Sequence, residues 1–203
     1  MTVKEFVISI LTHSNIQRVN FRYDTIRIYP DGYSRDVKKL VEDGHILFDT
    51  TEGAHYTVDA RPGEPHRMAL PAEHIDVPVS SPAARDAGRL NVRENLGQLG
   101  GARFRMTIVH EATHALQDYQ RHQSDPQTAE GAAYLAGWIT ALLWNYPRLE
   151  PGASANSGHA YARRLAAKVL DGEVGYVIPA AEVSRLNDRV AIGGERRYVF
   201  NGI

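Results

Sequence analysis

The stretch 102–122 reads ARFRMTIVHEATHALQDYQRH and is the clearest helical pattern in the chain. Its apolar residues recur at steps of three and four, which is typical of a helix with one buried face. They are Phe104, Ile108, Val109, Ala112, Ala115, Leu116 and Tyr119. The pattern therefore predicts a long and largely buried helix.

The predicted helix contains the motif H-E-x-x-H, formed by His110, Glu111 and His114. Residues four apart lie one above the other on a helix, so two imidazoles at this spacing can bind one ion at about 2.0–2.1 Å. Glu111 is rotated by about 100° from His110 and can instead reach a water molecule beside the ion. Two buried histidines and a glutamate without partners are unfavourable, and a metal ion removes that penalty. The motif therefore predicts a Zn²⁺ site with His110 and His114 as ligands and Glu111 as general base.

A catalytic zinc ion usually has three protein ligands and one open position. The chain has no cysteine, so the third ligand must be a histidine, an aspartate or a glutamate. The metzincin pattern fails, because Gln120 stands where its third histidine is required. The next predicted helix offers Glu130, which could alternatively complement the helix dipole from an early turn. Asp118 and Asp125 are competing carboxylates, although Asp125 is better explained as the N-cap before Pro126.

The segment from His110 onward resembles the gluzincin metallopeptidases as far as about Trp144. After the H-E-x-x-H motif, the match consists of Glu130, a run of small residues and Tyr134. The resemblance implies a zincin-like fold, peptide hydrolysis, and Glu130 as the third zinc ligand.

The sequence departs from the gluzincin pattern at two points. The connection between His114 and Glu130 is short for many members of the group. Tyr134 stands where several members carry an aspartate that orients a metal-binding histidine. Asp118, four residues after His114, is a substitute for that orienting role, or else a solvent-facing residue near the helix end.

Peptide hydrolysis also requires groups that stabilise the oxyanion. His159 and Tyr161, at the start of a predicted later helix, are the best placed by their order in the chain, and Tyr134 is a further option. Each of the three could instead be a packing or surface residue.

The overall pattern predicts a single α+β domain over residues 1–203, and the resemblance implies that this domain is zincin-like. Residues 1–80 form a sheet-rich part with a small mixed sheet and helices, and residues 81–203 form a mainly helical catalytic part. The expected helices are 3–12, 33–43, 83–97, 102–122, 126–146, 157–170 and 180–188. The expected strands are 19–29, 46–50, 55–60, 66–70 and 196–200. We expect residues 66–79 to supply a sheet edge that binds extended substrate by strand addition.

Composition and charge limit the possible binding partners and cellular locations of the protein. The formal net charge is -1, which gives no global field to attract nucleic acid. The longest apolar stretch, Ala132–Trp144, falls short of the roughly 20 residues of a membrane span. The N-terminus lacks a secretory signal pattern. We therefore expect a soluble protein that is cytoplasmic or exported by a signal-peptide-independent route.

The leading interpretation is a zinc metallopeptidase that acts on a peptide or protein substrate. One alternative is a non-catalytic zincin-fold binding module, and another is a zinc hydrolase of a non-peptide amide. An exported bacterial toxin or effector domain is a further setting for the same chemistry. Glu111 favours an enzyme, because a purely structural metal site needs no general base. The sequence determines neither the cleavage specificity nor the oligomeric state.

Overall fold

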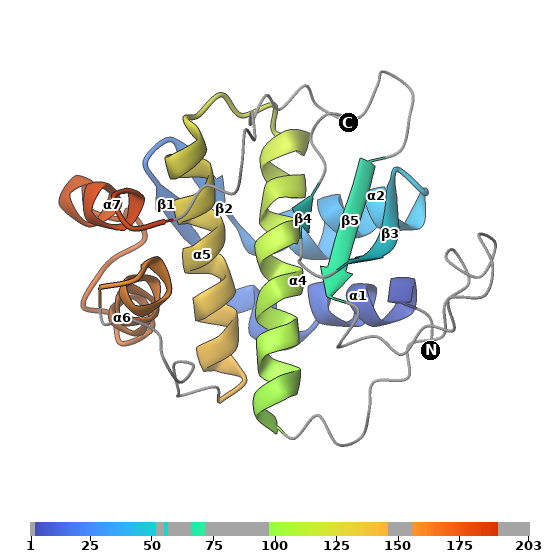
Figure 1. Ribbon diagram of the computed structural model, residues 1–203, viewed down its shortest axis with the longest axis horizontal. Coiled ribbons are helices and arrows are strands. Elements are labelled where there is room, and N and C mark those ends of the chain that lie inside the picture. Colours follow the sequence, from blue (N-terminus) through green and yellow to red (C-terminus); the bar gives the residue numbers. More distant parts are fainter. Residues whose placement is uncertain (1–2, 52–54, 57–65, 72–97, 146–155, 191–203) are drawn as a thin grey trace.

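The computed structural model describes residues 3–51, 55–56, 66–71, 98–145 and 156–190. Over these residues the protein is α+β, with its strands in the N-terminal part and a helical C-terminal half. Two long helices, α4 (Gln98–Tyr119) and α5 (Pro126–Leu143), lie side by side at the centre (Figure 1). The last two helices, α6 (Gly158–Leu170) and α7 (Ala180–Asn187), lie on the α5 side of this pair (Figure 1).

The chain begins with short helices and a hairpin. In order they are α1 (Val3–Leu11), the 3₁₀-helix η1 (Ser14–Arg18), β1 (Phe21–Tyr23), β2 (Ile26–Ile28), the π-helix η2 (Gly32–Val37) and α2 (Lys38–Glu42). The helices predicted at 3–12 and 33–43 are confirmed, the second with a π-helical first part. The single strand predicted at 19–29 is wrong, because β1 and β2 pair as an antiparallel hairpin. Asp24 turns the chain with a φ of 53°, a conformation that aspartate tolerates better than most residues.

The second sheet is mixed, as predicted, and contains β3 (Ile46–Thr51), β4 (His55–Tyr56) and β5 (His66–Pro71). β5 lies in the middle, parallel to β3 and antiparallel to β4. The expectation that residues 66–79 supply a sheet edge is therefore wrong for 66–71, because β5 has a partner strand on each side. Residues 72–79 lie outside the described part of the chain.

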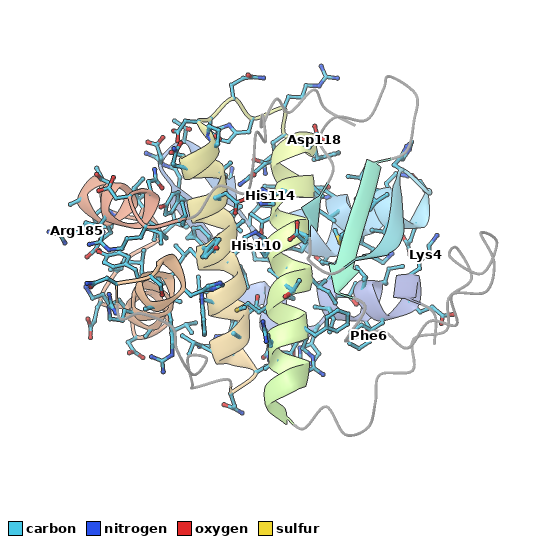
Figure 2. All side chains as sticks on the ribbon, viewed as in Figure 1. Lys4, Phe6, His110, His114, Asp118 and Arg185 are labelled. Atoms are coloured by element: carbon cyan, nitrogen blue, oxygen red, sulfur yellow. The ribbon has the colours of Figure 1, made fainter. Side chains whose placement is uncertain are left out.

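The buried face of α4 packs against the N-terminal elements. Six of the seven apolar residues predicted for this face are buried, namely Phe104, Ile108, Val109, Ala112, Ala115 and Leu116. The seventh, Tyr119, is 42% exposed at the end of the helix. Phe104 stacks on Phe6 of α1 with ring centroids 5.6 Å apart, on the side of α4 opposite to α5 (Figure 2). This packing leaves the other face of α4 for α5.

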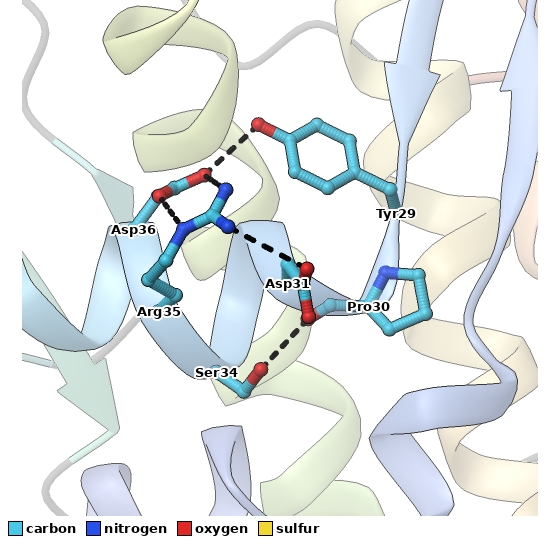
Figure 3. A network of polar contacts seen from close by, with 6 residues as sticks. All are labelled: Tyr29, Pro30, Asp31, Ser34, Arg35 and Asp36. Carbon is cyan, nitrogen blue, oxygen red and sulfur yellow. Dashed lines mark hydrogen bonds and ion pairs between the residues drawn. The ribbon is translucent and has the colours of Figure 1, made fainter.

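A polar network joins Tyr29 and Pro30, which follow β2, to side chains of η2 (Figure 3). The Tyr29 hydroxyl donates to Asp36 Oδ2 at 3.0 Å, and Arg35 Nε donates to Asp36 Oδ1 at 2.8 Å. The Ser34 hydroxyl donates to the Pro30 carbonyl at 3.2 Å. Asp36 is buried whereas Arg35 is exposed, so we attribute the anchoring mainly to the hydrogen bond from Tyr29, since exposed ion pairs contribute little.

Two glycines of α5 allow close approach on two of its faces. A Cβ atom on Gly137 would lie 3.1 Å from the Met106 carbonyl oxygen and 3.6 Å from the Cβ atom of His110. A Cβ atom on Gly131 would lie 2.6 Å from Asn187 Oδ1 of α7. Glycine therefore lets α5 pack tightly on α4 beside His110 and on α7 near its own start.

The predicted starts of two helices are confirmed. The Asp125 side chain accepts from the Thr128 backbone N–H at 2.9 Å and caps α5. The Ser157 side chain accepts from the Ala160 backbone N–H at 3.2 Å and caps α6. α5 ends at Leu143 rather than near residue 146 as predicted.

The helix predicted at 180–188 is confirmed as α7. Three further expectations lie outside the described residues, namely the helix at 83–97, the strand at 196–200, and the part of the strand 55–60 beyond β4. Among the described helices, none combines the length and apolar character required to cross a membrane.

Candidate metal centre

One face of α4 brings the three motif side chains together. One ligating atom from each of His110, Glu111 and His114 lies within 4.8 Å of the other two. Both histidines lie in the central part of α4 (Figure 2), and their Nε2 atoms approach Glu130 of α5. The group of His110, Glu111 and His114 could hold a metal ion.

Helix α5 adds a second carboxylate to this group. Glu130 Oε2 lies 3.3 Å from His110 Nε2 and 3.7 Å from His114 Nε2. In a tetrahedral site with metal–ligand bonds of about 2.0–2.2 Å, neighbouring ligand atoms are roughly 3.3–3.6 Å apart. The spacing of Glu130 from both imidazoles is therefore close to that of a third ligand.

Glu130 is an anion in this setting. Burial alone would raise the pKa of its carboxyl group, but the hydrogen bonds and charges of His110 and His114 outweigh burial and hold that pKa below its ordinary value. The carboxylate is only 5% exposed, so it is available to the two imidazoles while bulk water is largely excluded.

Gln117 fixes the orientation of His114, and sequence reasoning did not single it out for this role. Its amide nitrogen donates to the Ala129 carbonyl at 3.0 Å, so its amide oxygen faces His114 Nδ1 at 3.0 Å. An amide oxygen only accepts, and therefore Nδ1 must carry the proton. Neutral His114 then presents the lone pair of Nε2 toward Glu130.

That tautomer bears on whether a cation fits the site. If His114 is neutral with its proton on Nδ1, the Nε2 lone pair and the Oε2 lone pairs of Glu130 face one another at 3.7 Å. Two acceptors in a buried site oppose each other unless a positive charge lies between them. A metal ion, or a proton on His114 Nε2, would supply that charge, and the imidazole, imidazole and carboxylate donor set is one that divalent transition metals bind.

A buried hydroxyl pair lies next to the motif on α4. The Thr113 hydroxyl donates to the Val109 carbonyl at 2.7 Å, so the Tyr33 hydroxyl must donate to Thr113 Oγ1, which lies 2.8 Å away. Burial raises the pKa of Tyr33, which keeps the phenol protonated as a donor. Thr113, which directly precedes His114, is thereby tied to η2.

The rings of His110, Tyr134 and His159 lie next to one another in a row. The Tyr134 ring centroid is 5.2 Å from that of His110, and the His159 ring centroid is 4.7 Å from that of Tyr134. Burial, followed by the charges of Glu130 and Glu111, raises the pKa of Tyr134. The phenol therefore stays protonated and can donate a hydrogen bond near the motif.

Two predicted residues lie in other surroundings. The Tyr161 hydroxyl donates to Glu182 of α7, and its ring packs below the guanidinium of Arg189 at 5.0 Å. These contacts belong to the α6–α7 interface, and the structure does not bring Tyr161 to the motif. Asp118 is fully buried, so the solvent-facing alternative is wrong, and the partner that the structure gives to His114 Nδ1 is Gln117.

Replacing Gln117 with leucine is expected to weaken metal binding about 10- to 100-fold, because the histidine loses the group that fixes its tautomer. Competition with a coloured chelator measures the change. Gln120→Leu is the matched control, since that amide donates to the Arg27 carbonyl at 3.1 Å and does not touch the histidines. Equal affinity in the Gln117 variant and the wild type would show that the tautomer needs no such support.

Comparison of the chain with known proteins finds no matching family model, no matching curated protein and no matching solved structure. The functional assignment therefore depends on the geometry and chemistry of this site.

Proposed function

We propose that the protein is a zinc-dependent metallopeptidase of the zincin type, with His110, His114 and Glu130 as the zinc ligands. The observation that supports this most is the approach of both imidazole Nε2 atoms to Glu130 Oε2, at 3.3 and 3.7 Å. Two histidines and one carboxylate form a donor set typical of catalytic zinc sites, in which one position stays open.

Glu111 favours hydrolysis over other metal chemistry. Two histidines and a carboxylate also bind Fe(II) in oxygenases, so the donor set alone does not decide the reaction. Glu111 is only 3% exposed and lies within the same cluster of side chains. A second buried carboxylate beside the ligands suits a general base, which hydrolysis requires and dioxygen chemistry does not.

The proposed reaction assigns a proton-transfer role to Glu111 and hydrogen-bonding roles to Tyr134 and His159. Zinc, when bound, supplies Lewis acidity and makes water a stronger acid. Glu111 takes the proton from the attacking water and passes it to the leaving amine. Tyr134 donates a hydrogen bond to the oxygen that becomes negatively charged, since its raised pKa keeps the phenol protonated.

The His110 end and the His114 end of the site differ in their exposure to solvent. The His110 side chain is 21% exposed, whereas that of His114 is 2% exposed. His159 is exposed and continues the aromatic row from Tyr134. We therefore place the substrate on the side of the site formed by His110, Tyr134 and His159.

A cleavage assay tests the proposed function. The zinc-loaded protein is incubated with a mixture of unfolded proteins, and new peptide termini are identified by mass spectrometry. We expect cleavage that a zinc chelator abolishes and added zinc restores. A protein that binds zinc and produces no new termini would support the binding-module alternative. Cleavage that persists after complete metal removal would contradict the zinc mechanism.

A further inference from the structure

Trp138 of α5 makes a specific polar contact with His159 of α6. Its side chain is buried, with 3% exposure, and its indole Nε1–H donates to His159 Nδ1 at 3.2 Å. The two rings are nearly perpendicular, with centroids 6.1 Å apart. This arrangement directs the indole N–H at the edge of the imidazole that carries Nδ1.

The contact determines which nitrogen of His159 carries the proton. An indole N–H is a donor only, so His159 Nδ1 must accept and must be unprotonated. Neutral His159 therefore carries its proton on Nε2, which lies on the other side of the ring and acts as a donor. A proton on Nδ1 would set two N–H groups against each other.

The position of Trp138 on α5 connects this contact to the metal site. Glu130, Tyr134 and Trp138 follow one another at steps of four residues, and such residues share one face of a helix. His159 packs against Tyr134 with ring centroids 4.7 Å apart. One face of α5 thus carries the carboxylate near the two motif histidines, the tyrosine beside His110, and the tryptophan that holds His159.

We propose that Trp138 is a positioning residue, which holds His159 beside Tyr134 as the Nε2–H tautomer so that the imidazole donates a hydrogen bond to the substrate. This inference rests on the proposed function for its consequence in catalysis. Its structural content, the tautomer and its cause, does not depend on hydrolysis. Because His159 is exposed on α6, a buried hydrogen-bond partner fixes a ring that water would otherwise leave free to turn.

The direct test is the protonation of the His159 ring, read from long-range proton–nitrogen correlation spectra at neutral pH. His159→Gln identifies the signals by their absence. In the wild type we expect Nδ1 without a proton and Nε2 with one. A protonated Nδ1 in the neutral wild-type ring would overturn the proposal, whether or not any variant folds.

Trp138→Phe keeps an aromatic ring but removes the N–H group. The His159 nitrogen signals are expected to move toward averaged values, and kcat is expected to fall about tenfold with a smaller change in KM. Trp144→Phe is the matched control, because it alters the other tryptophan of the chain, which contacts His13 and Arg105 instead. Unchanged His159 signals in a folded Trp138→Phe would also overturn the proposal.

The two proposals fail in different ways. If the wild-type spectra show the Nε2–H tautomer and no peptide is cleaved, the metallopeptidase assignment fails and the role of Trp138 in fixing the tautomer stands. If peptides are cleaved and the spectra of wild type and Trp138→Phe coincide, the positioning role fails and the metallopeptidase assignment stands.

Discussion

His114→Ala is expected to lose its metal, with zinc falling from about one ion per chain to a trace, because a catalytic site has only three protein ligands. His114 is the more buried of the two histidines and is oriented by Gln117. Elemental analysis of the purified, zinc-loaded protein measures the change. Glu130→Ala is expected to weaken zinc binding severely for the same reason, while α5 keeps its apolar packing.

His122→Ala is the matched control for the loss of an imidazole. His122 lies just beyond the end of α4, where its Nε2 atom is 3.2 Å from Thr25 Oγ1. We expect this variant to bind zinc as the wild type does. Full zinc occupancy in His114→Ala would remove His114 from the set of ligands.

The second large effect is expected for Glu111→Gln, which should keep its zinc and its fold. Its activity should fall about 10²–10⁴-fold, because the variant has lost its general base. Glutamine has the size of glutamate and cannot take a proton from water at neutral pH. Steady-state peptide hydrolysis, normalised to zinc content, measures the loss.

The control for a Glu-to-Gln change is Glu173→Gln, at an exposed position just after α6, where we expect no change in rate. Zinc content distinguishes two explanations for an inactive Glu111→Gln. If the variant is inactive and has also lost its metal, Glu111 acts as a ligand. If it retains metal and turns over near the wild-type rate, Glu111 has a structural role.

The sequence predicted those parts of the fold that local signals determine. The helix at 102–119 follows from its apolar period, although α4 begins at Gln98 and ends at Tyr119 rather than spanning 102–122 as predicted. The start of α5 follows from Asp125 and Pro126, whose capping chemistry needs no distant partner. Spacing along one helix is enough to bring together the side chains of His110, Glu111 and His114.

Features that depend on distant partners were predicted less well. The order of the mixed sheet, with β5 in the middle, depends on which strands pair, and strand patterns do not specify that. Asp118 was considered as the residue orienting His114, but Gln117 has that contact because its amide also reaches the Ala129 carbonyl across the helix pair. A sequence pattern shows neither the distance between α4 and α5 nor the direction of that carbonyl.

Tyr161 and His159 illustrate the same limit within one helix. Both were considered as oxyanion donors because of their order in the chain, and they lie only two residues apart. Two residues correspond to a rotation of about 200° on a helix, so they face different neighbours. His159 meets Tyr134 and Trp138 of α5, whereas Tyr161 meets Glu182 of α7.

The most direct test of the central claim is a crystal structure of the zinc-loaded protein with anomalous diffraction data collected at the zinc edge. We expect one strong anomalous peak between α4 and α5, about 2.0–2.2 Å from His110 Nε2, His114 Nε2 and a carboxylate oxygen of Glu130. We also expect Glu111 outside the coordination sphere. The absence of a peak at these residues, or a different side chain in the place of Glu130, would contradict the account.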